Sequence, residues 1–393
     1  MTTSGSLPRV RALTAGVDLE TLGEWGPVDT ALGLLARARA RLAREGFEVQ
    51  LARLSLPPLL ARLDPPRRWT SLAHVRQLDA MAGEAGVVVS VGPLAIEDVP
   101  EAADVGLATW IADLNAATVD THASVVIASP DGGVHRHNAV IAAAAMRAIA
   151  AASADGLGNF RFAAAARVPA MTPFFPVAYH HGAPAISAGL ESAHLVHDAV
   201  REARHADEAG RRLIAHLGPA LMGVERVLDG IAHDERVHYA GIDTSPAPLA
   251  AVSIGAAIET LSGSAFGDAG TLDACATLTA AIKALPVRAC GYCGLMLPVL
   301  EDDVLAARAS EGRFGVRELL LYSSVCGTGL DVVPIPGDTP EAAIARLLLD
   351  VAALSTRLDK PLSARLLLAP GLAPGEMTTF ENPYLTNARV LAV

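Results

Sequence analysis

Residues 10–17, VRALTAGV, and residues 48–56, EVQLARLSL, are two apolar runs joined by a stretch with helical spacing. In that stretch, Asp29 is expected to cap a helix that ends at Gly46. Two successive strands joined through a helix need a crossover connection, which makes them parallel neighbours in one sheet. The first 56 residues therefore predict an α/β protein.

The same alternation continues along the chain. Further strands are predicted at 87–93, 124–128, 160–167, 185–190, 237–242, 295–299, 330–335 and 364–369. Asp338-Thr339-Pro340-Glu341 predicts a helix start, and 194–232 predicts a helix broken near Gly218-Pro219 that forms a lobe beside the sheet. About ten strands, mainly parallel and covered by helices, are consistent with a closed barrel or with a large open sheet.

The composition bounds the class of protein. The 393 residues contain no internal repeat and no evident linker, so we expect a single domain over 1–393. No apolar run is long enough for a membrane span, and residues 1–6 lack the pattern of a secretory signal, so a cytoplasmic location is expected. The formal net charge of -11 disfavours nucleic acid as a partner, and a homodimer is the default assembly.

Cofactor signals are weak. Cys290 and Cys293 have the spacing of half a zinc site or of a redox pair, but no second pair completes a metal site, so buried thiols are the favoured interpretation. The glycine-rich stretch 263–271 matches neither a P-loop nor a dinucleotide fingerprint. No nucleotide cofactor is predicted.

Polar residues that directly follow predicted strands are the candidates for chemistry, because ligands of parallel sheets bind at strand carboxyl ends. The loop 173–182, PFFPVAYHHG, offers His180 as acid, base or metal ligand; a solvent-facing structural histidine is the alternative. Asp243 ends the strand predicted at 237–242, where it would orient a histidine, ligate a cation or hold a substrate amine. An acceptor for its own turn is the equal alternative.

Two later clusters complete the set. Glu301 and Asp302 follow an apolar run at a helix start, where capping explains one acid more easily than several. Cys326 lies among small residues whose amides suit an anion or oxyanion and would activate the thiol. A small buried cysteine packed among glycines is its alternative.

The motifs VRALT (10–14), PFFPVAYH (173–180), GIDTSPAP (241–248), GYCGLMLPVLED (291–302) and SSVCGTGLDVVPIPGDTP (323–340) together resemble domain-of-unknown-function family 711, also called uncharacterised protein family 0210. The resemblance covers about residues 9–370. It implies a ten-stranded α/β barrel with helices outside, related to the pyruvate formate-lyase and ribonucleotide reductase fold, with Cys326 at a loop tip. Because no glycine follows Gly375, glycyl-radical chemistry is disfavoured.

The expected function is that of a non-radical enzyme, a lyase, isomerase or acyl transferase, acting on a small polar and anionic metabolite. Its predicted catalytic residues are Cys326, His180, Asp243 and Glu301, meeting at one opening of the barrel. Its predicted substrate-binding residues are Arg11, Tyr179, Ser245, Asp302, Gly327, Thr328, Gly329 and Asp331. A divalent ion at His180 and the acids is left open, and a non-catalytic small-molecule binder or regulatory protein is the alternative function.

Overall fold

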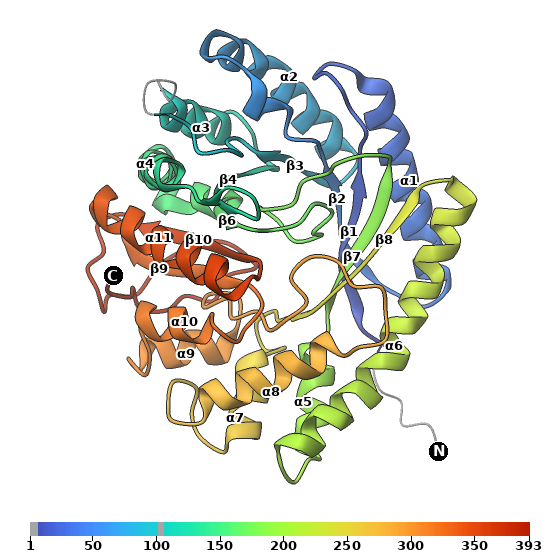
Figure 1. The fold of residues 1–393 in the computed structure, drawn as a ribbon, viewed down its shortest axis with the longest axis vertical. Helices are drawn as coiled ribbons and strands as arrows, with labels where there is room; N and C mark the ends of the chain where they lie inside the picture. The colour runs from blue at the N-terminus through green and yellow to red at the C-terminus, as the bar shows by residue number, and fades with distance from the viewer. Residues whose placement is uncertain (1–6, 101–105) are drawn as a thin grey trace.

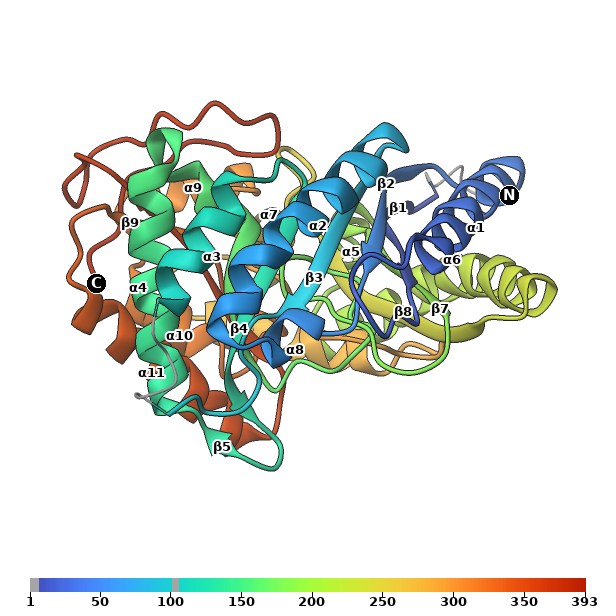
Figure 2. The same cartoon turned by 90° about the horizontal axis from the view of Figure 1, so that it is seen from above.

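The computed structural model describes residues 7–100 and 106–393 of the chain. The N-terminal residues 1–6, considered above for a secretory signal, lie outside the described residues. Figure 1 shows the strands along a curved arc with the helices on its outer side. Figure 2 shows four of these helices, α4, α3, α2 and α1, side by side along one flank.

The elements follow one another with few long connections. The strands are β1 (Arg9–Gly16), β2 (Val49–Ser55), β3 (Val87–Pro93), β4 (Thr121–Ser129), β5 (Gly133–Val134), β6 (Phe162–Ala166), β7 (Ala185–Glu191), β8 (His238–Ala247), β9 (Gly329–Pro336) and β10 (Leu362–Ala369). The α-helices are α1 (Trp25–Arg44), α2 (Pro65–Glu84), α3 (Leu107–Ala116), α4 (Arg136–Ala152), α5 (Ala193–Arg201), α6 (Ala206–Glu235), α7 (Ile254–Ser262), α8 (Thr271–Lys283), α9 (Asp303–Ser310), α10 (Val316–Tyr322) and α11 (Glu341–Leu358). Two 3-10 helices, η1 (Leu59–Arg62) and η3 (Ala154–Arg161), complete the described elements.

The ten strands form one mixed sheet in the order β8-β7-β1-β2-β3-β4-β6-β10-β9, with the short β5 paired to β4. Strands β1, β2, β3, β4 and β6 are parallel to one another. Two antiparallel junctions, β1 with β7 and β6 with β10, reverse the direction on either side of this block. The mainly parallel sheet predicted from the crossover helices is confirmed, and the reversals at its two flanks were not predicted.

Membership of the sheet differs from the prediction at two strands, because the two-residue β5 was not predicted and one predicted strand is missing. The run 295–299 is not a strand, because only isolated bridges form there, including Pro298 with Asp331. A second isolated bridge joins Ile242 of β8 to Ala289. The segment 289–298 therefore touches both end strands of the sheet, β8 and β9, without a continuous ladder to either.

Three helix boundaries also differ. Asp29 lies inside α1, whose N-cap is Glu24, so it is not the predicted cap. Helix α11 begins at Glu341 without a side-chain cap, because Pro340 occupies the N-cap position. Helix α6 continues through Pro219, and the interruption falls at residues 202–205, between α5 and α6.

The core has two parts. The larger part lies between sheet and helices and is built mainly from Ala, Val and Leu. The smaller part contains Phe174, Tyr292 and Met296 packed against two alanines of β6. Loop residues therefore fill the concave side of the sheet.

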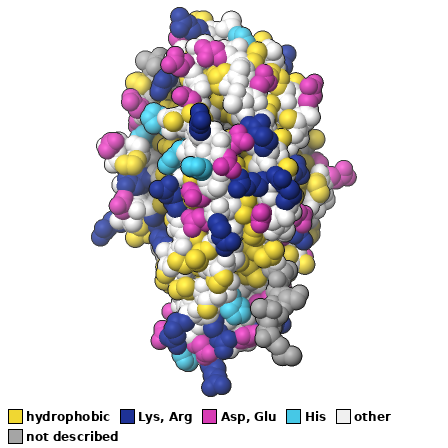
Figure 3. All heavy atoms as spheres, turned by 90° about the vertical axis from the view of Figure 1, so that its right-hand side faces the viewer, with side chains coloured by type: hydrophobic (Ala, Val, Ile, Leu, Met, Phe, Trp, Pro, Cys, Tyr) yellow, Lys and Arg dark blue, Asp and Glu magenta, His cyan; other side chains and the backbone are white. Residues whose placement is uncertain are grey.

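The surface mixes charges of both signs. On the face shown in Figure 3, basic and acidic side chains are interspersed around a smaller apolar area. No helix within the described ranges is both long and apolar enough to cross a bilayer.

Candidate functional site

A cavity of about 540 Å³ opens on the concave side of the sheet. That volume is within the range of sites for small metabolites. Its charged and aromatic lining residues are Arg11, Arg53, Asp120, His122, Phe160, Arg161, Phe174, Phe175, Glu301, Asp331, Arg365 and Tyr384. Most of its strand residues come from the first halves of their strands, so this cavity does not lie at the carboxyl ends of the parallel block, where a site was expected.

One side of the cavity carries a continuous ion-pair cluster, which we call the paired cluster: Arg11, Glu301, Arg365 and Asp331. Arg11 donates to Glu301 at 2.7 Å, and Arg365 donates to the other oxygen of Glu301 at 2.9 Å. Arg365 also donates from Nε to Asp331 at 2.8 Å. Each carboxylate of this cluster therefore has at least one guanidinium partner.

Backbone irregularities bring the paired cluster together. The register between β1 and β7 shifts at Arg11, and the register between β10 and β9 shifts at Arg365. A bulge re-aims the side chain that it carries, and both arginines line the cavity. Burial alone would lower the pKa of Arg365, but its ion pairs with Asp331 and Glu301 outweigh burial and raise that pKa. Burial raises the pKa of Asp331, against the opposing charge of Arg365.

Arg53 of β2 differs from the paired cluster. Its side chain is buried, its Nη1 donates to the carbonyl of Pro173 at 3.1 Å, and its guanidinium lies 4.9 Å from the centre of the Phe175 ring. Its Nε is buried without a hydrogen-bond partner, and no carboxylate within the described residues forms an ion pair with it. Burial, followed by the charge of Arg11, lowers the pKa of Arg53 to about 9, so it remains a cation at neutral pH.

His122 of β4 contacts the same aromatic ring. Its imidazole meets Phe175 edge to face at 5.1 Å between ring centroids, and its Nδ1 is buried without a partner. Burial, followed by the positive charge of Arg53, lowers the pKa of His122 well below its usual range. The imidazole is therefore neutral at pH 7.

The loop 173–182 contributes its aromatic residues to the cavity rather than its histidines. The carbonyl of Pro173 accepts from Thr14 at 3.2 Å as well as from Arg53, which fixes the loop against β1 and β2. Phe174 and Phe175 follow and line the cavity.

His180 lies at the far end of this loop, off the cavity lining. Its backbone N–H donates to Leu56, and its Nε2 is 2.7 Å from the carbonyl oxygen of Gly182. Burial lowers the pKa of His180. Burial also raises the pKa of the neighbouring Tyr179. Neither of the two predicted side chains reaches the paired cluster.

Asp243 is buried as the anchor of a neighbouring loop. It accepts from the backbone N–H groups of Tyr292 at 2.7 Å and Cys293 at 3.0 Å, and from the hydroxyl of Ser245 at 2.6 Å. Burial raises the pKa of Asp243, and these donors oppose the rise. Asp243 and Ser245 therefore hold the 290–294 turn, and neither lines the cavity.

Asp302 links two helix starts. It accepts from Val304 and Leu305 at the beginning of α9, and from Ser253 and Ile254 at the beginning of α7. The capping alternative describes Asp302, whereas Glu301, one residue earlier, faces the cavity.

The cysteine loop lies away from the cavity. Cys326 is fully buried in the helix-side core, and its backbone N–H donates to Tyr322 at 2.8 Å. Gly327 packs so closely on Gly294 that an added Cβ would lie 2.6 Å from the backbone of Gly294. The flanking Thr328 and Gly329 lead into β9, and the Thr328 hydroxyl is buried without a partner. The expected meeting of Cys326, His180 and Asp243 with Glu301 in one opening is therefore wrong.

The described residues form no other metal or thiol centre. Burial raises the pKa of Cys290, and it raises the pKa of Cys293 to about 11, so both are thiols at neutral pH. In the part of the chain that the structure describes, no group of three or more His, Cys, Asp or Glu residues is arranged to hold a metal ion.

Comparison with known proteins places the chain in a family. The family described as Uncharacterised ACR (DUF711) matches residues 6–381. The chain belongs to the DUF711 family. It is 31% identical over 392 residues to a UPF0210 protein of Pyrobaculum islandicum, covering 95% of this chain and 84% of that protein. It is 28% identical over 398 residues to a UPF0210 protein of Desulforudis audaxviator, covering 94% and 88%. The predicted family is confirmed, and neither printed name assigns a reaction.

In this DUF711 protein, sequence reasoning identified three of the cavity residues, Arg11, Glu301 and Asp331, and missed the others. Arg53 and Arg365 carried a usable signal, because each is the lone charged residue of a largely apolar strand. Such charges are rarely buried unless they are paired or functional. The aromatic residues of 173–182 were quoted only as the setting of His180.

Proposed function

We propose that the cavity binds a small anionic metabolite and that the protein acts on it by polar acid–base chemistry. The observation that carries the proposal is Arg53, a buried cation whose Nε has no partner. Burying an unpaired charge is costly, so such a group calls for a ligand of opposite sign. Guanidinium and carboxylate match each other in a planar, two-bond geometry.

His122 supports the catalytic part of the proposal. It is neutral, it lines the cavity, and it shares the Phe175 ring with Arg53. We propose that Arg53 holds the carboxylate of the substrate while His122 removes a proton from the neighbouring carbon, because the bound carboxylate would offset the charge of Arg53 that lowers the pKa of His122. Proton abstraction of this kind begins lyase and isomerase reactions. The thiol chemistry expected from Cys326 is not proposed again, because that side chain is off the cavity.

The binding step is tested with Arg53→Met in the full-length protein. Ligand-induced thermal shifts are measured with acetate, propionate, succinate and inorganic phosphate, since a ligand of the folded state raises the melting temperature. The wild type should respond to at least one anion and Arg53→Met to none. Arg37→Met, at an exposed ion pair with Glu235, is the matched control and should respond as the wild type does. Equal responses of Arg53→Met and the wild type would contradict the proposal.

A non-catalytic binder is the second candidate, favoured by the absence of any thiol among the residues that line the cavity. The two are separated by incubating a bound carboxylate in deuterium oxide and following its α-hydrogen by NMR. Exchange that requires His122 supports catalysis. Binding without exchange in the wild type supports the binder.

We also propose that the sheet closes into a ten-stranded barrel related to the pyruvate formate-lyase fold. The two bridges of segment 289–298 to β8 and β9 support closure, since this segment lies between the two end strands. An experimental structure with continuous ladders from 289–298 to both end strands would establish closure. An open gap between β8 and β9 would contradict it.

A further inference from the structure

We infer that the ligand is a monocarboxylate with an apolar, ring-sized body, rather than a phosphate or a dicarboxylate. This inference rests on the proposed function, because it assumes that the cavity around Arg53 is the binding site. It follows from the balance of charge on the cavity wall and from the character of the rest of the lining.

The charged groups of the wall leave one cation without a partner. Four arginines and three acids line the cavity. Arg11 and Arg365 already form ion pairs with Glu301 and Asp331 within the paired cluster. Among Arg11, Arg53 and Arg365, only the guanidinium of Arg53 is therefore both buried and without a carboxylate partner in the described residues.

The fourth arginine, Arg161, is held by other acceptors. Its Nη1 donates to the carbonyl of Thr121 at 2.9 Å, and its Nη2 donates to the carbonyl of Asn115 at 2.7 Å. The adjacent Asp120 also lines the cavity, and burial raises its pKa. Arg161 is therefore tied to the start of β4 and is not a second free anion receptor.

A second anionic group on the ligand would meet the wrong surroundings. Beyond Arg53, the nearest charged side of the cavity is the paired cluster, whose carboxylates, Glu301 and Asp331, already accept from Arg365. Like charges at short range repel strongly in a partly buried site. A dicarboxylate or a phosphate would have to displace an existing ion pair, whereas a monocarboxylate needs only Arg53.

Gln50, Ser153 and Asn382 also line the cavity, but much of the remaining wall is apolar and includes two phenylalanine rings. The residues concerned are Leu51, Val88, Leu157, Phe160, Phe174 and Met296. Phe160 is itself stacked by the Arg365 guanidinium, 4.9 Å from its ring centre, which fixes its orientation. A flat apolar body would gain both area burial and ring contacts here.

The C-terminal segment completes this wall with Tyr384. The segment is attached beside the paired cluster, where the Thr386 N–H donates to Leu300 and its hydroxyl donates to Asp303, both at 2.6 Å. Tyr384 lines the cavity while its side chain stays half-exposed. Its ring therefore offers one more flat surface at the outer side of the site.

The test measures dissociation constants by calorimetry with the full-length protein and five probes: 3-phenylpropionate, 3-phenylpropanamide, hexanoate, succinate and inorganic phosphate. We expect 3-phenylpropionate to bind most tightly, with hexanoate about three- to tenfold weaker. Succinate, phosphate and the neutral amide should each bind at least tenfold more weakly than 3-phenylpropionate. Arg53→Met should remove carboxylate binding, and Phe160→Leu should reduce the preference for 3-phenylpropionate over hexanoate. Phe380→Leu, at a buried ring off the cavity lining, is the control.

The outcomes separate the inference from the proposed function. Tighter binding of succinate or phosphate that depends on Arg53 would overturn the inference and leave the proposed function intact. Failure of every anion to bind in an Arg53-dependent way would overturn both. If Arg53→Met does not fold, Arg53→Lys replaces it and should weaken 3-phenylpropionate at least tenfold, because an ammonium lacks the planar fork.

Discussion

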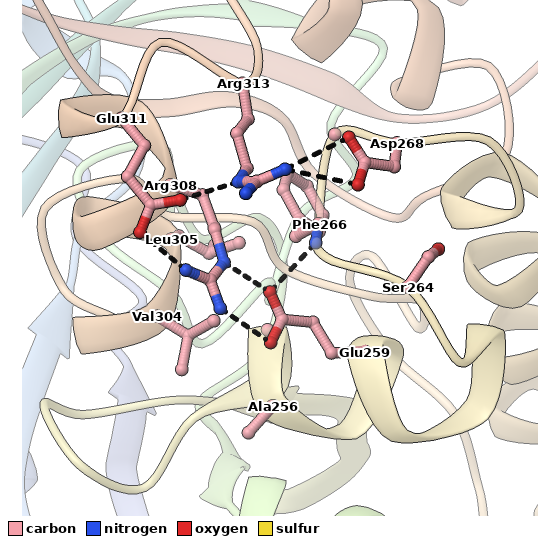
Figure 4. A network of polar contacts seen from close by, with 12 residues as sticks. Ala256, Glu259, Ser264, Phe266, Asp268, Val304, Leu305, Arg308, Glu311 and Arg313 are labelled. Atoms are coloured by element: carbon pink, nitrogen blue, oxygen red, sulfur yellow. Dashed lines mark hydrogen bonds and ion pairs between the residues drawn. The ribbon is translucent and has the colours of Figure 1, made fainter.

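Two arginine clusters in this protein follow opposite rules. At the surface, Arg308 donates two hydrogen bonds to Glu259, at 2.6 and 3.1 Å, and one to Glu311 at 2.6 Å (Figure 4). Arg313 continues the chain to Asp268. In the cavity, by contrast, the paired cluster stops short of Arg53. Every charge of the surface cluster has a partner within the chain, whereas the cavity contains a cation, Arg53, that has no carboxylate partner among the described residues.

That difference indicates what each cluster does. A saturated, partly exposed network joins α7 to α9 and contributes less stability than a buried one, because water partly solvates its charges. A buried network is stable only while every charge has a partner, because removing one charged side chain leaves its partner buried without a counter-charge or water. The buried cation without a carboxylate partner is therefore the basis for proposing a ligand from outside the chain.

The largest expected effect comes from breaking the paired cluster. Arg365→Met should lower the free energy of unfolding by roughly 3–5 kcal/mol, because Asp331 and Glu301 would be left buried with an excess of negative charge. Urea denaturation measures the loss, with the exposed Arg357→Met as the control. A loss below about 1 kcal/mol would mean that the cluster is not energetically buried.

The next effect is a dependence on pH. The pKa of His122 is lowered on folding, so below about pH 6.5 the unfolded chain takes up a proton that the folded chain refuses. Stability should therefore fall with acidification, by up to about 1.4 kcal/mol per pH unit. Denaturation of wild type and His122→Gln between pH 7 and 5 measures this, and the difference isolates His122 because the buried acids titrate in both. Parallel curves would contradict a neutral His122.

A smaller effect of opposite sign is expected at Arg53. Without ligand, Arg53→Met should leave stability unchanged or raise it by about 1 kcal/mol, because a buried charge without a carboxylate partner is exchanged for an apolar side chain of similar length. The same denaturation experiment decides it. A loss comparable to that of Arg365→Met would place Arg53 with the structural arginines.

The smallest effect is expected at the surface cluster. Arg308→Ala should cost about 1 kcal/mol, because its contacts to Glu259 and Glu311 are only partly shielded from water. Added salt should reduce that cost further, because screening weakens exposed charge pairs. A cost above 2 kcal/mol that salt does not change would show that this network behaves like the buried one.

The sequence predicted the scaffold better than the site. Strands such as β3 are apolar on both faces, which distinguishes them from the amphipathic helices that follow. Candidate residues were sought where turns follow strands, and that rule led to His180, Asp243 and Asp302. In the structure, each of these three side chains instead forms hydrogen bonds with backbone groups of nearby loops or helix ends. A polar residue after a strand has the same sequence pattern whether it binds a ligand or caps a turn.

The sequence by itself determined the family, the alternation of strands and helices, and the pairing of buried apolar strands into one mainly parallel sheet. These depend on local periodicity and on the need to cover apolar faces. Only the tertiary structure decided which charges meet. Arg11 and Arg365 are more than 350 residues apart and are brought to Glu301 by bulges in two strands, and residues 173–175 are folded across the sheet from a distant loop. Register and bulges depend on contacts between strands, which no single segment of the sequence encodes.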